Sequence, residues 1–313
     1  MTFPYRFLVF PLALFFDIIL GDPPNRFHPT AWMGSLTRWL MRFRPRGNRL
    51  IEFMFGFFIL LVGFAVAAGI GLAITLLAYR LPVWIGILLQ AFALKLTLSL
   101  CGLDRAAKEV QSALETGNLS EARRLLAWHL VSRDTSQLNE SQVSAAAVES
   151  VAENASDGII APLFFYAMGG LPAALAYRFI NTADSMLGYR DAEREWLGKF
   201  PARFDDVLNF IPARLTGLFI MLSALICGAN PGQAWRIMRR DARQTASPNA
   251  GVPMSAMAGA LNTELEKVGH YILGKGLHSP SVIDLVRARR LLYCSVGMAA
   301  LVFMSWSLYV YSR

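Results

Sequence analysis

The sequence has little charge. Asp, Glu, Lys and Arg make up only 17% of its 313 residues, whereas hydrophobic residues make up 55%; a typical soluble domain is roughly a quarter charged. Several uncharged runs exceed the ~20 residues that cross a bilayer as a helix. This composition excludes a disordered chain and argues against a soluble enzyme. We predict an all-α, polytopic integral membrane protein with about six membrane segments, some broken or re-entrant, and helical cytoplasmic loops.

Cysteine and the common catalytic signatures are also scarce. The three cysteines, Cys101, Cys227 and Cys294, are isolated in or beside apolar runs and lack metal-ligand spacing, so we expect buried thiols. No GxxxxGK[ST], GxGxxG, HExxH or GxSxG motif is present, which excludes an ordinary P-loop and leaves nucleophilic Ser or Cys catalysis unsupported. What remains is chemistry on charged substrates, carried out by acidic groups and arginines together with a metal ion.

The net charge of +8 comes from 30 Lys and Arg against 22 Asp and Glu. No basic stripe is interleaved with aromatic residues, so we expect no nucleic-acid partner. Loop charge that sets orientation and meets anionic lipid explains the excess. We therefore expect a multi-pass protein of the cell (inner) membrane.

The chain reads as a single membrane-embedded domain over residues 1–313. The segment 158–177 is uncharged but is interrupted by Pro162, Gly169, Gly170 and Pro172, a composition typical of a broken or re-entrant helix. Residues 81–100 directly follow Arg80 through a tight turn, and Lys95 is expected to snorkel to an interface. The membrane segments are predicted near residues 7–20, 53–79, 81–100, 158–177, 215–235 and 291–312.

Charged loops indicate the orientation. Residues 22–52 carry six arginines, which places them in the cytoplasm. The soluble helical loop 101–157 and the polar loop 236–290 are then cytoplasmic too, whereas the side of residues 178–214 stays open. Within the first of these loops, Gly117-Asn118 separates two helices, and Ser120 is the expected N-cap of the second, which ends near Leu130.

Three carboxylates recur at helical spacing before the broken segment. Glu149, Glu153 and Asp157 stand at i, i+4 and i+8 and share one helical face. Like charges at this spacing repel unless a cation lies between them, and carboxylate oxygens are ligands that Mg²⁺ prefers. The alternative is a solvated acidic face with Asp157 as a helix cap.

Further polar clusters lie at the ends of apolar segments, where charged groups commonly pair or form a site. Each has a simpler interpretation: an ion-pair network around the aspartates and arginines, a structured turn at Asp22 and His28, and a helix-ending turn at 132–135. The clusters contain Asp22 and His28; Arg133 and Asp134; Asn181, Asp184, Ser185 and Tyr189; and Arg203, Asp205, Asp206, Asn209 and Arg214.

Taken in order, these short motifs resemble one family, the CobD/CbiB cobalamin biosynthesis proteins, which are adenosylcobinamide-phosphate synthases. The resemblance runs from Asp17 to about Leu291. It is carried by Asp17-x-x-x-Gly21-Asp22-Pro23, His28-Pro29, Gly34, Arg133-Asp134-Thr135, Glu149-x-x-x-Glu153-Asn154-x-x-Asp157-Gly158, Asn181-x-x-Asp184-Ser185-Met186-x-Gly188-Tyr189, Asp205-Asp206-x-x-Asn209-x-x-Pro212-Ala213-Arg214, Ser247-Pro248-Asn249-x-Gly251 and Ala258-Gly259-Ala260-Leu261.

The resemblance implies a reaction and its reactants. Family members join aminopropanol phosphate, or a related amino alcohol phosphate, to the propionate carboxylate of adenosylcobyric acid, with ATP as co-substrate and Mg²⁺. An acyl phosphate is the expected intermediate, and the active site is expected to face the cytoplasm. The large corrin would lie in an apolar cavity lined by Ala161–Pro172. Association with other late cobalamin enzymes follows from pathway logic.

Residue roles follow as expectations of this resemblance. Asp184 is expected to accept the proton of the amine, and Arg133, Arg203 and Arg214 to neutralise phosphate charge. The metal would be held by Glu149, Glu153 and Asp157, with Asp184, Asp205 or Asp206 completing the shell. The substrate-binding set is Asp22, His28, Asp134, Asn181, Ser185, Tyr189, Asn209, Ser247 and Asn249.

Two other functions remain open. The chain could be a non-catalytic regulatory membrane protein of the same fold, but such relatives lose many of the polar motifs that this chain retains. It could also be a small transporter, although no inverted repeat is visible and much of the polar content lies in loops.

Overall fold

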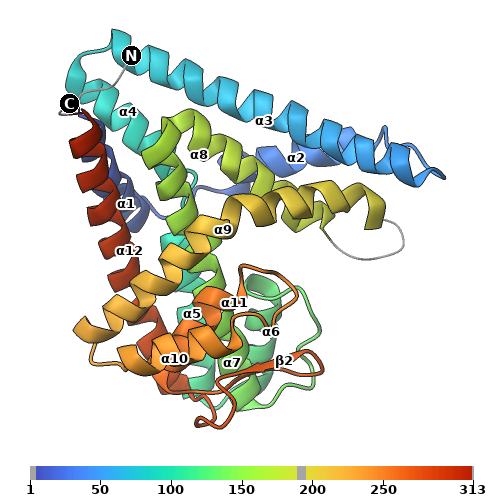
Figure 1. Cartoon of the computed structure of the whole chain (residues 1–313), viewed down its shortest axis with the longest axis vertical. Helices are drawn as coiled ribbons and strands as arrows, with labels where there is room; N and C mark the ends of the chain where they lie inside the picture. The colour runs from blue at the N-terminus through green and yellow to red at the C-terminus, as the bar shows by residue number, and fades with distance from the viewer. Residues whose placement is uncertain (1–4, 189–194, 312–313) are drawn as a thin grey trace. The chain divides into compact units, whose positions relative to one another are not determined.

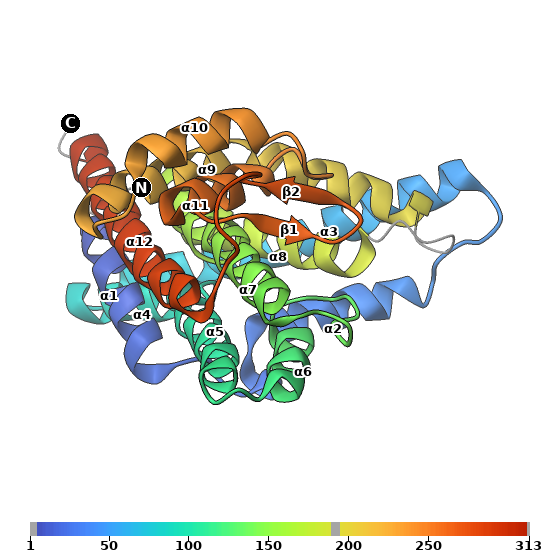
Figure 2. The same ribbon diagram turned by 90° about the horizontal axis from the view of Figure 1, so that it is seen from below.

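The computed structural model describes residues 5–188 and 195–311, apart from the side chains of Asn25 and Tyr311. The described chain is almost entirely helical, with one two-stranded sheet (Figures 1 and 2). Its internal contacts divide it into two compact units, a finer division than the single domain expected from the sequence. Unit 1 comprises Met1–Ser99, Ala161–Asn209 and Ala300–Arg313, and unit 2 comprises Leu100–Ile160 and Phe210–Ala299.

Unit 1 is a group of helices built around α3 and α8. Helix α3 packs along α8 and also contacts α2 and α4, while α1 packs on α4. The helices of this unit are α1 (Val9–Leu20), α2 (Pro29–Met41), α3 (Arg49–Arg80), α4 (Val83–Lys95) and α8 (Ala161–Leu187), with the first part of α9 (Glu195–Ile226) and the last part of α12 (Val282–Tyr311).

Unit 2 combines helices with the small sheet. Figure 2 shows the antiparallel β1–β2 hairpin beside α7 and α11, with which it makes contacts. The unit contains α5 (Leu100–Glu115), α6 (Leu119–His129), α7 (Glu140–Ala155), α10 (Pro231–Asp241), α11 (Gly251–Leu261), β1 (Leu265–Lys267) and β2 (Tyr271–Leu273), together with the remaining parts of α9 and α12.

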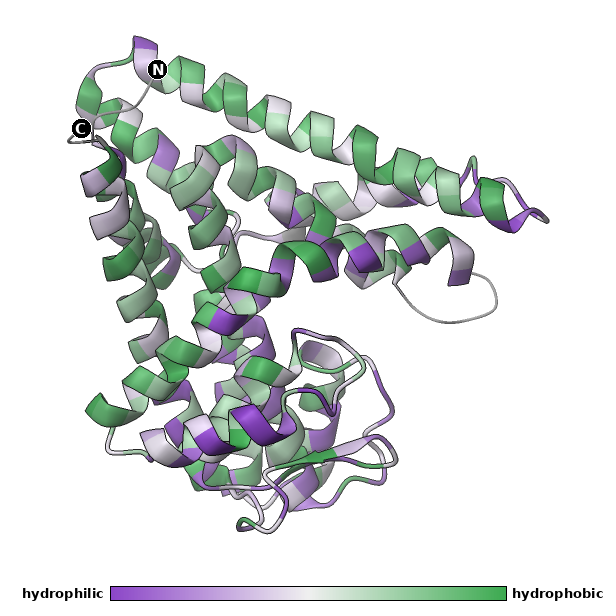
Figure 3. Cartoon of the chain, viewed as in Figure 1, coloured by the Kyte–Doolittle hydropathy of each residue, from purple (hydrophilic) through white to green (hydrophobic). Residues whose placement is uncertain are grey.

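Five helical stretches of the described chain are long and apolar enough to cross a membrane, which confirms the polytopic, all-α prediction. Figure 3 shows α3 coloured as hydrophobic or near neutral over most of its length. The first predicted segment is different, because α1 has only 12 residues, fewer than a spanning helix needs. The stretches are Arg49–Arg80, Val83–Glu115, Glu140–Leu187, Glu195–Ile226 and Val282–Val310.

Glycines allow α3 and α8 to approach each other closely. A Cβ atom on Gly63 would lie 1.8 Å from the ring of Phe179, and one on Gly71 would lie 2.6 Å from the Cα of Pro172. Small residues of this kind are the usual means by which apolar helices pack without a hydrophobic driving force between them. This contact fixes the helix that carries several of the predicted site residues.

The predicted interruption of segment 158–177 is confirmed. Gly170 adopts a left-handed backbone conformation (φ 72°), and Pro172 follows inside α8. A Gly–Pro pair breaks the helix because glycine tolerates this φ and proline donates no backbone hydrogen bond. The buried guanidinium of Arg6 lies beside Gly170 and 4.7 Å from the ring of Tyr166.

Two local predictions need correction. Asn118, not Ser120, caps α6: its side-chain oxygen accepts a hydrogen bond from the Glu121 amide at 3.1 Å. Asp157 is not a helix cap, because α7 passes into a π-helical turn over Ser156–Ile160 that leads directly into α8. The Arg80–Pro82 turn, by contrast, is confirmed by the end of α3 at Arg80 and the start of α4 at Val83.

The α3–α8 contact yields a stability prediction with a matched control on the same helix. Gly71→Ala should lower the free energy of unfolding in detergent by about 1–3 kcal/mol, because its methyl group meets backbone that must move. Gly69→Ala should leave stability unchanged or raise it by up to ~1 kcal/mol, since nothing lies within 4 Å of its Cβ. Equal thermal stability of the two variants would contradict the packing described.

Candidate functional site

Asp205 is the centre of a buried polar cluster in unit 1. Its carboxylate accepts hydrogen bonds from Asn209 Nδ2 at 2.8 Å and from Asn181 Nδ2 at 3.4 Å. The hydroxyl of Tyr177 donates to Asn209 Oδ1 at 2.8 Å. Residues from α8 and α9 therefore hold this carboxylate in place inside an apolar surrounding, where an unsatisfied charge would be costly.

Two further carboxylates lie close enough to interact with Asp205. Asp184 and Asp206 repel each other, and both repel Asp205. Carboxylates gathered in this way favour the binding of a proton or a cation. We call Asn181, Asp184, Asp205, Asp206 and Asn209 the Asp205 cluster; all five residues were predicted as site residues from the sequence.

A second polar group of unit 1, the Asp22 group, consists of Asp22, His28 and Lys95. Asp22 Oδ1 lies 4.0 Å from both His28 Nε2 and Lys95 Nζ. Lys95 does not snorkel as expected: only 2% of its side chain is exposed, and its ammonium donates to the backbone carbonyl of Gly21. The Asp22 carboxylate and the Gly21 carbonyl stabilise the Lys95 ammonium in place of the solvent that it would have reached by snorkelling.

His28 is positioned by its place at the start of α2. Its Nδ1 accepts a hydrogen bond from the Thr30 amide at 3.2 Å and so caps the helix. Burial lowers the pKa of His28, the nearby Asp22 carboxylate raises it, and Arg178 and Lys95 lower it further. Arg178 also lies 3.5 Å from Asn181 Oδ1, so it links the Asp22 group to the Asp205 cluster.

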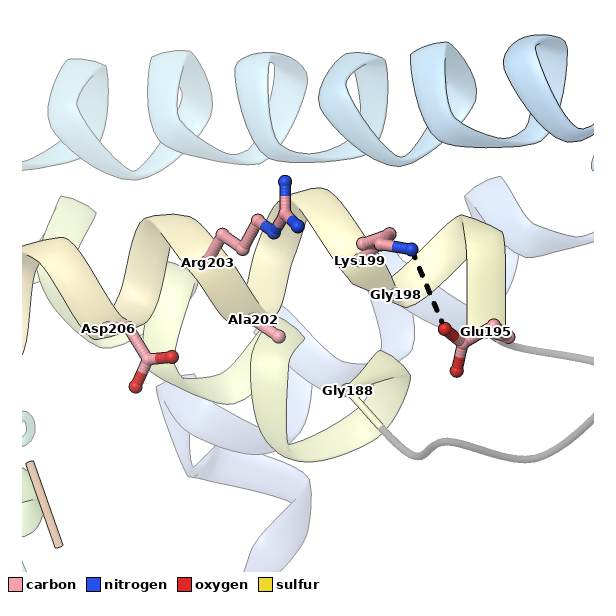
Figure 4. A pocket seen from close by; sticks show the side chains of 7 residues that line it. All are labelled: Gly188, Glu195, Gly198, Lys199, Ala202, Arg203 and Asp206. Carbon is pink, nitrogen blue, oxygen red and sulfur yellow. Dashed lines mark ion pairs between the residues drawn. The ribbon is translucent and has the colours of Figure 1, made fainter. Parts of the chain in front are cut away.

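A charged pocket of about 280 Å³ opens beside the Asp205 cluster. It is formed by the end of α8 and the first turns of α9 (Figure 4). Lys199 Nζ lies 3.7 Å from Glu195 Oε1, and Arg203 and Asp206 follow on the same helix. The lining residues are Gly188, Glu195, Gly198, Lys199, Ala202, Arg203 and Asp206.

Glycines bring the two walls of the charged pocket together. A Cβ on Gly198 would lie 1.8 Å from the carbonyl oxygen of Leu187, so α9 passes α8 at a distance that only glycine allows. A Cβ on Gly188 would lie 2.3 Å from Asp184 Oδ1. The carboxylate of Asp184 is therefore adjacent to the pocket wall.

Unit 2 contains a separate acid–base group, the Glu149 cluster: Arg133, Glu149, Glu153, Lys267 and Tyr271. Arg133 Nη2 lies 3.9 Å from Glu149 Oε2, and the Tyr271 hydroxyl bonds to Glu149. The negative charge of Glu153 acts on Glu149, and the positive charge of Lys267 acts on both carboxylates. Burial, together with these two carboxylates, raises the pKa of the Tyr271 hydroxyl, which therefore stays protonated as a hydrogen-bond donor.

The predicted metal ligands belong to both units: Glu149, Glu153 and Asp157 to unit 2, and Asp205 and Asp206 to unit 1. Within residues 5–188 and 195–311, no three Asp, Glu, His or Cys side chains come together as a metal-sized group. The π-helical turn changes the register of Asp157 relative to Glu149 and Glu153 on α7, because its repeat is longer than that of an α-helix. Glu149 Oε1 is buried and has no hydrogen-bond partner among the described residues.

This donor set fits a magnesium ion that arrives with a nucleotide better than one held by protein alone. Mg²⁺ usually takes one or two protein carboxylates and completes its shell with water and substrate phosphates. Glu149 and Glu153 could supply such a pair in unit 2, and two of the three aspartates could do so in unit 1. Metal binding stays a prediction at both places.

The remaining predicted site residues have defined local contacts. The exposed Asp134 caps its own turn by accepting bonds from the Ser136 amide and hydroxyl at 2.9 and 3.0 Å, which lower its pKa. Ser185 donates to the Asn181 carbonyl at 2.9 Å. Tyr189 lies outside the described residues.

Arg214 in unit 2 holds the loop that precedes α11. Its Nη1 donates to Asn249 Oδ1 at 2.6 Å and its Nη2 to the Pro248 carbonyl at 3.2 Å. The hydroxyl of Ser247 accepts from the Asn249 amide at 3.2 Å. Three predicted site residues are thus brought together by direct hydrogen bonds.

Sequence reasoning missed six charged or polar residues of these groups: Lys95, Arg178, Glu195, Lys199, Lys267 and Tyr271. Lys95 could have been found, because it is the lone charge in an apolar run, and Arg178 because it borders one. For Lys199 the sequence offers only its i+4 spacing from Arg203. For Tyr271 it offers nothing, because the β-hairpin brings this residue to Glu149 from far along the chain.

Unit 1 also contains an apolar cavity of about 350 Å³. It was expected to be lined by Ala161–Pro172, but α8 contributes Leu175 and Phe179, which follow the break. The other lining residues come from α2, α3, α4 and the turn after α4: Pro29, Trp32, Met33, Leu36, Gly63, Val66, Ala67, Ile70, Ile74, Ala93 and Leu96.

The fold and these clusters define a polytopic, all-α membrane protein that gathers carboxylates, amides and cations into compact groups. Comparison with known proteins identifies it further. The chain belongs to the CobD/Cbib protein family, whose family model matches residues 10–291. No solved structure gives a significant match.

Curated relatives agree with this assignment. The chain is 46% identical over 274 residues to "Cobalamin biosynthesis protein CobD" of Dehalococcoides mccartyi, which covers 85% of this chain and 86% of the relative. It is 39% identical to the "Probable cobalamin biosynthesis protein CobD" of Methanothermobacter thermautotrophicus, with 92% and 95% covered. It is 37% identical to "Cobalamin biosynthesis protein CbiB" of Salmonella typhi, with 95% and 96% covered.

The environment of His28 predicts a pH dependence. Because burial lowers its pKa below the ordinary value of about 6.5, the neutral imidazole contributes stability that is fully present above pH ~6.5 and lost as pH falls through the folded-state pKa. Asp22→Asn should lower the His28 pKa further, because a negative charge that favours imidazolium is removed.

Imidazole NMR signals, assigned with His28→Gln, would measure this in a chain that has four histidines. Glu52→Gln, on α3 of the same unit, is the control and should leave the His28 pKa unchanged. A rise in that pKa in Asp22→Asn would contradict the arrangement of Asp22 and His28.

Proposed function

We propose that this protein acts in cobalamin biosynthesis as an adenosylcobinamide-phosphate synthase. In this reaction ATP and Mg²⁺ drive amide formation between the propionate carboxylate of adenosylcobyric acid and the amine of aminopropanol phosphate or a related amino alcohol phosphate. Membership of the CobD/Cbib family supports the pathway. The observation that carries the chemistry is the convergence of three distant motifs, Asp22–His28, Asn181–Asp184 and Asp205–Asn209, on one polar region of unit 1.

The reaction requires two steps because a carboxylate and an amine do not condense readily in water. In the first step a carboxylate oxygen of the corrinoid attacks the γ-phosphorus of ATP, which forms an acyl phosphate and releases ADP. In the second step the amine attacks the acyl carbon, and inorganic phosphate leaves with the bridging oxygen. Arginines beside the phosphate stabilise the charge that develops in both steps; Arg133, Arg203 and Arg214 are the candidates.

The second step needs an uncharged amine. An ammonium group must first lose a proton, and Asp184 is our candidate acceptor because its Oδ1 lies against Gly188 in the wall of the charged pocket. Asp205 and Asp206 repel its carboxylate, and such repulsion favours proton uptake. The Asn181 and Asn209 amides keep Asp205 in place and so preserve this repulsion.

We propose the Glu149 cluster, on its charges, as a candidate nucleotide site within unit 2. Arg133 would bind phosphate oxygens, and Glu149 and Glu153 would hold the accompanying Mg²⁺, which supplies charge neutralisation on the triphosphate. Because ATP is a cytoplasmic co-substrate, we place the active site on the cytoplasmic face of the inner membrane. Association with other late cobalamin enzymes stays a prediction.

A reconstituted reaction tests the proposed function. Protein purified in detergent is mixed with adenosylcobyric acid, ATP, Mg²⁺ and aminopropanol phosphate, and the product mass is measured. Wild type should give adenosylcobinamide phosphate, and Asp184→Asn should be slower by roughly 10²-fold or more. Glu121→Gln, which changes an exposed pair with Arg124 on α6, is the control and should match wild type.

The metal assignment is tested in the same assay. Asp157→Asn keeps the size of the side chain and removes its charge, so a ligand role predicts lost activity or a raised Mg²⁺ requirement. Unchanged activity and Mg²⁺ dependence would remove Asp157 from the ligand set. No product from folded wild-type protein with either amino alcohol phosphate would instead favour the regulatory or transport function.

A further inference from the structure

In the charged pocket of unit 1, the cations and the Asp206 carboxylate occupy different stripes of α9, a separation that the sequence motifs do not predict. Glu195, Lys199 and Arg203 stand at i, i+4 and i+8 on α9 and so share one stripe of the helix. Gly198, Ala202 and Asp206 form the neighbouring stripe at the same spacing. One stripe therefore carries two cations and the Glu195 carboxylate that pairs with Lys199, and the other offers a floor of small residues that ends in a carboxylate.

The close-up view supports this separation. In Figure 4 the Lys199 ammonium reaches toward Glu195, while Arg203 and Asp206 leave the same stretch of α9 toward different sides, with Ala202 between them. One helical turn or less separates Arg203 from Asp206, a rise of about 4.5 Å along the axis. The pocket can therefore face an anionic group at one place and a cationic group a short distance away.

Its size limits the ligand. A cavity of about 280 Å³ lies at the lower end of the roughly 300–1,000 Å³ range of small-molecule sites. A corrin or a nucleoside triphosphate would exceed it, whereas a short amino alcohol ester would not. Apart from Ala202, charged side chains and glycines line it, which suits a fully charged molecule.

We propose that this pocket binds the small zwitterionic substrate, a primary amine joined by a short chain to a phosphate monoester. Lys199 and Arg203 hold its phosphate, which takes Arg203 out of the candidates for the acyl phosphate, and Asp206 faces the ammonium group. The inference rests on the proposed function for the identity of the ligand, and it adds Lys199 as a phosphate-binding residue outside the sequence motifs.

Charge matching favours a free monoester. A phosphate monoester carries close to two negative charges at neutral pH, which Lys199 and Arg203 neutralise once Lys199 exchanges Glu195 for the phosphate. A zwitterionic lipid headgroup has the same amine and phosphate groups, but its phosphodiester carries a single charge. The ammonium end, when it faces Asp206, also lies near Asp184, the proposed proton acceptor, because these two carboxylates are close enough to interact.

The test is a binding titration that needs neither corrinoid nor ATP. Wild-type protein in phosphatidylglycerol nanodiscs is titrated calorimetrically with aminopropanol phosphate, with propyl phosphate, which lacks the amine, and with aminopropanol, which lacks the phosphate. Lys199→Gln and Arg203→Gln should each weaken binding of both phosphates at least tenfold. Asp206→Asn should weaken aminopropanol phosphate at least tenfold and leave propyl phosphate unchanged or tighter.

Lys108→Gln, which removes an exposed cation on α5, is the matched control and should bind all three ligands as wild type does. Equal loss of all ligands in every pocket variant, or no loss in Lys199→Gln, would overturn the proposal. So would competition by phosphatidylethanolamine nanodiscs, because that result assigns the pocket to a lipid headgroup.

Kinetics separate this inference from the proposed function. If wild type makes the amide product while Lys199→Gln keeps the KM for aminopropanol phosphate, the pocket assignment is wrong and the ligase stands. If the titration shows the ligand-selective losses but no amide product forms, the pocket assignment stands and the ligase is wrong. A raised KM for aminopropanol phosphate in Lys199→Gln, with the KM for the corrinoid unchanged, supports both.

Discussion

The structure depends on how charged groups are kept inside an apolar protein. An isolated charge in a medium of low dielectric constant is very costly, so each buried carboxylate must have a partner. Asp205 has two amide donors from α8 and α9, and the ammonium of Lys95 has the Gly21 carbonyl and Asp22. Glu149 has Arg133 and Tyr271. These requirements hold distant segments together and create the sites where charged substrates could bind.

Close helix packing makes those partners available. Gly63 and Gly71 let α3 lie against α8, and Gly198 lets α9 pass the end of α8. The aspartates and asparagines on α8 and α9 are therefore held by rigid elements and not by loops, which suits chemistry that depends on placement within a fraction of an ångström. The break at Gly170–Pro172 lies on the same helix and ends its first half before the polar residues begin.

Much of the fold and part of the candidate site could be predicted from the sequence. Uncharged runs reveal the apolar helices, and Gly170 with Pro172 reveals the break, because both signals are local. Asn181, Asp205 and Asn209 were found as motif residues, and the structure brings them together. Asp157 shows the limit of such reasoning: its i+8 spacing from Glu149 assumes an uninterrupted α-helix, and a π-helical turn changes it. Tyr271 depends on a tertiary contact with Glu149 that leaves no mark in spacing.

The central claim is that a carboxylate is activated by phosphorylation and then captured by an amine. The most direct measurement uses adenosylcobyric acid labelled with ¹⁸O in its propionate carboxylate and determines the isotope content of the phosphate released with the amide. The account predicts one ¹⁸O atom in each inorganic phosphate, with ADP as the nucleotide product. Unlabelled phosphate, or ¹⁸O found in AMP, would contradict it.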